Sequence, residues 1–98
     1  MPTYISLVSY TDEGIQQIRE SPDRLDAARA LGESLGVELH EFYLTMGQYD
    51  AVVLIEAPDE ETATTYALRV GSDGAVATET LLAFEEDEFR DIIARLPE

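Results

Sequence analysis

The sequence predicts an α+β fold of the ferredoxin-like type, with a four-stranded antiparallel sheet and its helices on one face. The first observation is the order of the hydrophobic segments, βαββαβ followed by one more helix. The second is the length of 98 residues, which suits a single domain over residues 1–98. The third is that the first and third strands carry apolar side chains on both faces. Central strands have this pattern, so we expect the strand order 4-1-3-2.

The first strand is predicted over Thr3–Tyr10, because this segment is rich in β-branched and aromatic residues. A helical pattern follows and is interrupted at Ser21–Pro22, where a serine cap and a proline at the first position can restart a helix. We therefore expect one bent helix, or two helices in series, over about residues 12–35. Gly36 is expected to end this helical segment.

Two strands, Val37–Met46 and Tyr49–Ala57, are separated only by Gly47–Gln48. Such a short connection predicts an antiparallel hairpin in which the last residue of one strand faces the first residue of the other. The apolar phase of the first of these strands changes at His40–Glu41, which indicates a β-bulge. The direction of the His40 side chain stays open.

The hairpin register divides its side chains between the two faces of the sheet. The almost wholly apolar set is expected to pack under the helices: Phe42, Leu44, Met46, Tyr49, Ala51, Val53 and Ile55. The mixed set is expected to face a partner, or a pocket between sheet and partner: Tyr43, Thr45, Asp50, Val52 and Leu54.

The second half of the chain repeats the pattern of helix and strand. A helix begins at Pro58–Glu61 and carries apolar residues at helical spacing as far as Val70, before a turn at Gly71–Gly74. The last strand is predicted over Ala75–Phe84. A final helix begins in the acidic run Glu85–Glu88, and its apolar face consists of Phe89, Ile92, Ile93 and Leu96.

One face of this sheet has no cover within the chain. Two helices cover only one face, while the other face keeps an apolar centre. Soluble monomers rarely leave such a patch exposed. We therefore predict a homodimer, or a larger homo-oligomer, in which the sheets pack face to face.

The charge of the chain excludes several kinds of partner. Six arginines, no lysine and 21 acidic residues give a net charge of −15. Nucleic acids and anionic membranes need clustered basic residues, so neither is an expected partner.

No apolar run is long enough for a transmembrane helix, and the N-terminus lacks the basic segment of a signal peptide. We expect a cytoplasmic protein.

The absence of lysine suggests an environment. A charge of −15 on a small domain repels itself and destabilises the compact state. At molar salt the Debye length falls to about 3 Å, and the repulsion is screened. We therefore hypothesise a halophilic source, such as a haloarchaeon. The alternative is a base-composition bias that favours arginine.

The residues suited to chemistry are few. With no cysteine and one histidine, no metal site and no cofactor are predicted. Tyr43 and Asp50 form the best polar pair, the carboxylate as a base and the phenol to orient a carbonyl. His40 is a second candidate base. The ligand-binding candidates are Tyr4, Tyr10, Tyr43, Thr45 and Asp50.

Each candidate also has a structural interpretation. Asp50 can satisfy backbone groups of the hairpin, and His40 can be an ordinary edge-strand residue. The tyrosines can fill an interface. The sequence leaves these alternatives open.

The stretch from Phe42 to Asp50 resembles the signature of the GYD family, here Gly47, Tyr49 and Asp50. The resemblance continues over the whole chain, for example at Ser21–Arg24 and Glu79–Phe84. It implies a small prokaryotic protein of unknown function in the dimeric α/β-barrel class. That class includes cofactor-free monooxygenases, isomerases and small-ligand sensors.

Two functions therefore remain. The first is a homodimeric module that binds a small uncharged or apolar ligand and is adapted to high salt. The second is a cofactor-free monooxygenase or isomerase that uses Asp50 or His40 as the base and Tyr43 to orient the substrate. Only the analogy of fold supports the enzyme.

Overall fold

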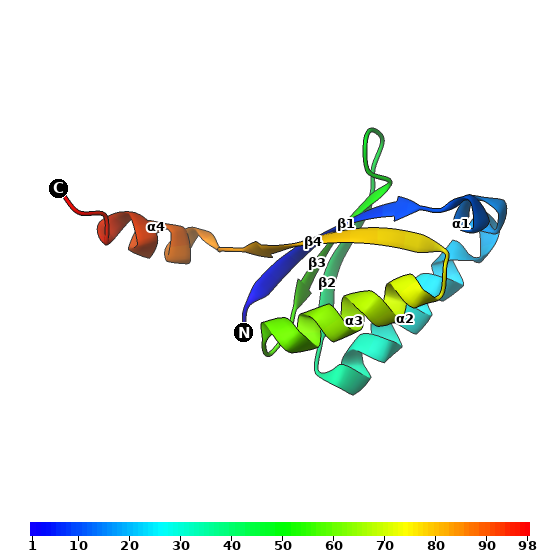
Figure 1. Ribbon diagram of the computed structural model, residues 1–98, viewed down its shortest axis with the longest axis horizontal. Coiled ribbons are helices and arrows are strands. Elements are labelled where there is room, and N and C mark those ends of the chain that lie inside the picture. The colour runs from blue at the N-terminus through cyan, green and yellow to red at the C-terminus, as the bar shows by residue number, and fades with distance from the viewer.

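The computed structural model describes residues 1–98 and contains one antiparallel sheet in the order β2-β3-β1-β4 (Figure 1). The strands are β1 (Thr3–Tyr10), β2 (Glu38–Leu44), β3 (Ala51–Glu56) and β4 (Val76–Ala83). Read from the other edge, this is the expected order 4-1-3-2, with β1 and β3 in the centre. The predicted α+β class and strand order are confirmed.

The helices α2 and α3 lie against one face of the sheet (Figure 1). The predicted interruption at Ser21–Pro22 is present, and α3 continues into the segment that was predicted to be a turn. None of the helices has the length and hydropathy needed to cross a bilayer. The helical elements are α1 (Asp12–Gln16), the 3₁₀ turn η1 (Ile18–Glu20), α2 (Ser21–Leu35), α3 (Glu60–Ser72) and α4 (Glu86–Ala94).

Side chains at the helix starts satisfy backbone N–H groups that have no partner within the helix. The Asp59 carboxylate accepts from the N–H of Thr62 at 2.8 Å, and the hydrogen bonds from Thr62 lower the pKa of Asp59. At α4, Glu85 and Glu88 form a reciprocal capping box. At the other end of α2, Gly36 adopts φ 79°, the left-handed conformation that ends helices.

The hairpin has the predicted register. Leu44 faces Ala51, and the next pair is closed by a 2.8 Å hydrogen bond from the Thr45 N–H to the Asp50 carbonyl. The predicted bulge is also confirmed, because the pairing shifts by one residue between Leu39 and Glu41.

The prediction that the whole apolar set of the hairpin packs under the helices is wrong at its tip. Leu44 is 71% exposed and Met46 is 99% exposed. The hydroxyl of Tyr49 instead lies 3.5 Å from the Glu79 carboxylate on β4. The alternation of side chains determines the face on which each residue lies, but the hairpin tip extends beyond the reach of the helices (Figure 1).

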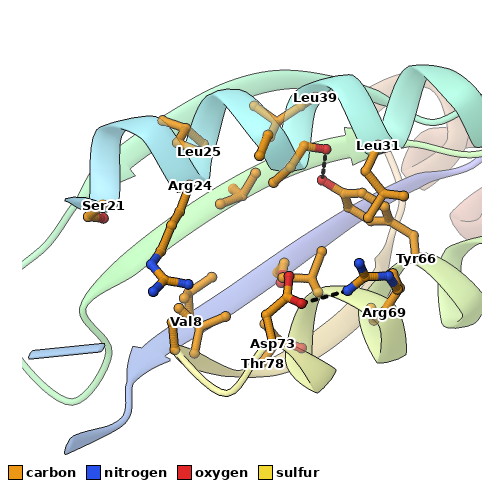
Figure 2. A pocket seen from close by; sticks show the side chains of 18 of the residues that line it. Val8, Ser21, Arg24, Leu25, Leu31, Leu39, Tyr66, Arg69, Asp73 and Thr78 are labelled. Carbon is orange, nitrogen blue, oxygen red and sulfur yellow. Dashed lines mark hydrogen bonds and ion pairs between the residues drawn. The ribbon is translucent and has the colours of Figure 1, made fainter. Parts of the chain in front are cut away.

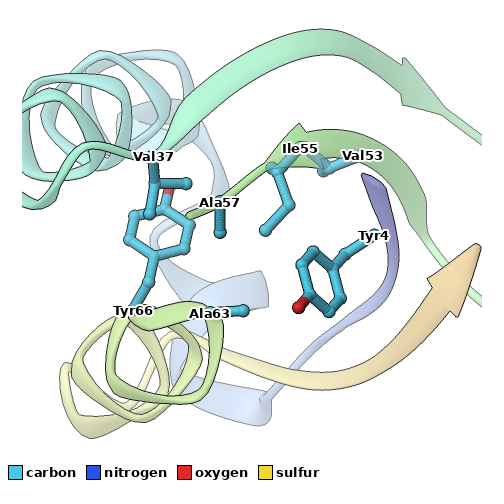
Figure 3. Close-up of a cluster of buried hydrophobic side chains, with 7 residues drawn as sticks. All are labelled: Tyr4, Val37, Val53, Ile55, Ala57, Ala63 and Tyr66. Carbon is cyan, nitrogen blue, oxygen red and sulfur yellow. The ribbon is translucent and has the colours of Figure 1, made fainter. Parts of the chain in front are cut away.

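The core lies between the sheet and the two helices (Figure 3). Gly32 allows α2 to approach the strand that follows it, because a Cβ there would lie 2.9 Å from the Val37 carbonyl oxygen. The opposite face has no cover within the chain, and we call it the open face. The buried cluster consists of Tyr4, Val37, Val53, Ile55, Ala57, Ala63 and Tyr66.

Candidate functional site

A cavity of about 320 Å³ lies between the sheet and the helices α2 and α3 (Figure 2). Most of its wall is apolar, with contributions from Val8, Leu25, Leu31 and Leu39. A few polar side chains are interspersed. A mostly apolar wall with a small number of polar groups is typical of small-molecule sites. The polar lining residues include Ser6, Tyr10, Ser21, Arg24, Thr78 and Thr80.

Arg24 is the charged group of this cavity that lacks a full set of partners. Its side chain extends from α2 across the cavity toward Val8 (Figure 2). One terminal nitrogen donates to the Gln17 side chain, but Nε is buried and has no partner. A buried donor without an acceptor is energetically costly. The guanidinium is therefore suited to receive a carboxylate or another anionic oxygen.

Several other polar groups of the cavity are paired. The hydroxyls of Tyr10 and Ser21 lie 2.7 Å apart, and Arg69 donates to Asp73 at 2.6 Å. The Tyr66 hydroxyl donates to a backbone carbonyl of α2 at 2.9 Å, and burial raises the pKa of this phenol. Arg24 is therefore the charged side chain of the lining that keeps a buried nitrogen without a partner.

The tyrosines proposed from sequence do not share one pocket. Tyr4 lies in the core, where its hydroxyl has no partner, and burial raises its pKa with a further contribution from the acids that begin α3. Tyr10 lines the cavity. Tyr43 follows the half-buried Phe42 on β2 and lies on the open face, 55% exposed. The structure therefore does not bring Tyr4, Tyr10 and Tyr43 together in one pocket.

Asp50 and Thr45 hold the backbone near the hairpin tip. The Asp50 carboxylate accepts from the N–H of Tyr10 at 2.8 Å, and its own N–H donates to the Val8 carbonyl at 2.8 Å. The Thr45 hydroxyl donates to the Tyr49 carbonyl at 2.7 Å. Neither side chain lines the cavity. These contacts agree with the structural interpretation of Asp50.

His40 projects from the bulge toward the open face, between two carboxylates. Its Nε2 lies 3.0 Å from Glu56 and 3.5 Å from Glu38, which face each other directly across β2 and β3. Like charges in this position repel, and the imidazole reduces that repulsion. The three residues offer ligand atoms within 4.8 Å of one another, so they are the set that could hold a metal ion.

Arg24 is not among the site residues predicted from the sequence. The sequence nevertheless contains a pattern that could have identified it. One helix face is formed by residues at helical spacing: Arg24, Ala28, Leu31 and Leu35. An arginine on the otherwise apolar face of a helix is a candidate for a buried role. The strand residues Thr78 and Thr80 also line the cavity and were not among the predicted site residues.

Comparison with known proteins identifies the family. A family model described as the GYD domain matches residues 4–93. A protein of Thermus thermophilus is 36% identical over 97 residues, which cover 98% of this chain and 99% of that relative. It is named "Glutamine synthetase and cystathionine beta-lyase binding protein".

Solved structures share the fold. The protein TTHA0845 from Thermus thermophilus aligns with a TM-score of 0.56 at 28% identity, over 87% of this chain and 95% of that chain. A feast or famine regulatory protein from M. tuberculosis, complexed with L-methionine, aligns with a TM-score of 0.67 at 15% identity. That alignment covers 87% of this chain, which spans about half (51%) of the regulator. Together with the signature at Gly47, Tyr49 and Asp50, the family match shows that this chain belongs to the GYD-domain family.

Proposed function

We propose that this protein is a non-catalytic, homodimeric binding module whose cavity takes a small carboxylic acid with an apolar body. The observation that carries the proposal is the buried, unpartnered Nε of Arg24 in the cavity between α2 and the sheet. A guanidinium in an apolar enclosure binds a carboxylate strongly, because little water competes for it.

The rest of the cavity narrows the class of ligand. The cavity volume of about 320 Å³ is at the lower end of ligand sites, which favours a molecule of amino-acid size. Val8, Leu25 and Leu31 suit an aliphatic or thioether side chain. The paired hydroxyls of Tyr10 and Ser21 can accept from an ammonium group. The sequence suggested an uncharged or apolar ligand, and Arg24 changes this to a carboxylate.

The alternative of a cofactor-free enzyme has less support. Its candidate residues His40, Tyr43 and Asp50 do not line the cavity. His40 contacts two carboxylates, and Asp50 accepts a backbone N–H. A base needs access to its substrate, and the observed partners occupy both groups.

The first test uses Arg24→Met, which keeps an apolar stem and removes the guanidinium. L-methionine and L-leucine are titrated calorimetrically in 2 M KCl beside their primary amides, which lack the carboxylate. We expect the variant to bind the amino acids at least tenfold more weakly, a loss of about 1.4 kcal/mol, and the amides to bind the native protein equally weakly.

The matched control is Arg29→Met on the exposed side of the same helix, where Arg29 lies 3.7 Å from Asp26. It removes the same charge outside the cavity and should leave binding unchanged. Equal affinity of native protein and Arg24→Met, or no preference for the acids over the amides, would show that Arg24 is not the anchor.

A second function is favoured by the Thermus relative. Because that protein is named for binding glutamine synthetase and cystathionine β-lyase, we propose that this chain also docks on a metabolic enzyme of this kind. We expect glutamine synthetase from the same organism, immobilised for surface plasmon resonance, to bind the native protein at micromolar concentration or below. An unrelated acidic protein of similar charge is the control. Equal responses would indicate charge alone and would contradict specific docking.

A further inference from the structure

The C-terminal helix α4 stands away from the rest of the molecule (Figure 1). None of its residues is buried, and no other helix or strand of the chain has extensive contact with it. The apolar stripe of α4 is defined as Phe89, Ile92 and Ile93 on the helix, together with Leu96 just after its end. It is exposed to solvent, with Ile93 at 48% and Leu96 at 64%.

A helix of this length needs a surface to pack on. Isolated helices shorter than about 12–15 residues are marginal in water, and α4 has nine residues. Its capping box and the ion pair from Arg90 to Glu86 at 2.7 Å add local stability, but such pairs contribute only about 0.2–0.5 kcal/mol. The apolar stripe indicates a packing partner outside its own chain.

The open face is a second uncovered apolar surface in the same chain. Its centre consists of Ile5 and Leu7 on β1 with Val52 and Leu54 on β3, all partly exposed, and Leu81 on β4 is 43% exposed. The stripe does not cover this surface in its own chain. A two-fold dimer allows each copy to cover the open face of the other, because a two-fold interface uses the same surfaces twice.

We infer that α4 is an exchanged arm, whose apolar stripe packs on the open face of a second copy of this chain. The inference rests on the proposed homodimer and names the element that completes its interface. A stable interface buries about 800 Å² on each partner. The few apolar side chains at the centre of the open face provide only a small part of that buried area. The stripe adds four large apolar side chains to it.

The charges agree with this arrangement. The open face has exposed acids at its rim, Glu41 on β2 and Glu79 on β4. Arg95 follows α4 directly beside the stripe and makes no ion pair within its own chain. Opposite charges at the rim of an interface favour association and fix its orientation.

The test compares Ile93→Asp, on the stripe, with Ala94→Asp, the next residue and on the other side of α4. Both add one acid to the same turn, so their charge and helix-dipole effects are matched. Sedimentation equilibrium in 2 M KCl measures the dimer dissociation constant. We expect Ile93→Asp to raise it at least tenfold and Ala94→Asp to change it less than threefold.

The possible results distinguish a failure of the homodimer from a failure of the exchanged arm. A native protein that is monomeric at tens of micromolar would overturn both the homodimer and the exchanged arm. A native dimer that Ile93→Asp does not weaken would overturn the arm and leave the homodimer standing. The thermal midpoint at concentrations where both variants are monomeric should be the same. A lower midpoint for Ile93→Asp would show that α4 packs on its own chain, and would overturn the arm.

Discussion

In dilute buffer the thermal midpoint of this protein is expected to lie at least about 10 °C below its value in 2 M KCl. The net charge of −15 is carried by a chain with a single small core. For a domain of this size, each 1 kcal/mol of stability shifts the midpoint by about 4–8 °C. Screening that recovers about 2–3 kcal/mol therefore produces the expected rise.

The structure shows why the repulsion is not neutralised internally. Arginine forms only three ion pairs, with Asp26, Asp73 and Glu86, so most of the 21 acids have no cationic partner. Glu38 and Glu56 face each other across β2 and β3, and the His40 imidazole lies 3.5 Å from the first and 3.0 Å from the second. Exposed charges lose most of their mutual repulsion when the Debye length falls to about 3 Å.

The measurement is a series of unfolding curves from 0.05 to 3 M KCl. A control variant replaces exposed acids away from the open face by their amides, for example Glu20, Glu33 and Glu61 by glutamine. Its midpoint should depend less on salt, because less repulsion remains to be screened. A native midpoint that is insensitive to KCl would contradict salt adaptation and support a base-composition bias toward arginine.

Gly14→Ala is expected to lower the free energy of unfolding by about 3 kcal/mol, toward the upper end of what overpacking costs. Gly14 is buried in α1, and a Cβ there would lie 2.0 Å from the carbonyl oxygen of Ala75. That carbonyl cannot move away freely, because it accepts the N–H of Thr11 at 3.0 Å. The new methyl group therefore displaces α1 from the start of the last strand.

The matched control is Gly71→Ala in α3, where a Cβ would meet nothing within 4 Å. Alanine favours the helix over glycine by about 0.8–1 kcal/mol, so this variant should be as stable as the native protein or slightly more stable. Urea denaturation at one fixed KCl concentration measures both. A loss below about 1 kcal/mol for Gly14→Ala would show that α1 adjusts to the added methyl group.

The sequence by itself determined the elements, their order and the family. The register of the hairpin followed from the two residues Gly47–Gln48, and the bulge at His40 followed from a change in apolar phase. The central places of β1 and β3 followed from apolar residues on both faces. These features depend on neighbours in the chain or on the two-residue period of a strand, which a sequence displays directly.

Only the tertiary structure decided what covers each face and where a cavity remains. Tyr4, Tyr10 and Tyr43 were similar candidates in the sequence, yet the structure places one in the core, one at the cavity and one on the open face. Arg24 became a candidate anchor because α2 holds it over the sheet. Likewise, the sequence predicted that the stripe of α4 forms one helix face. It did not predict that α4 stands away from the sheet. Alternation assigns a side chain to a face, whereas burial depends on which distant element reaches that face.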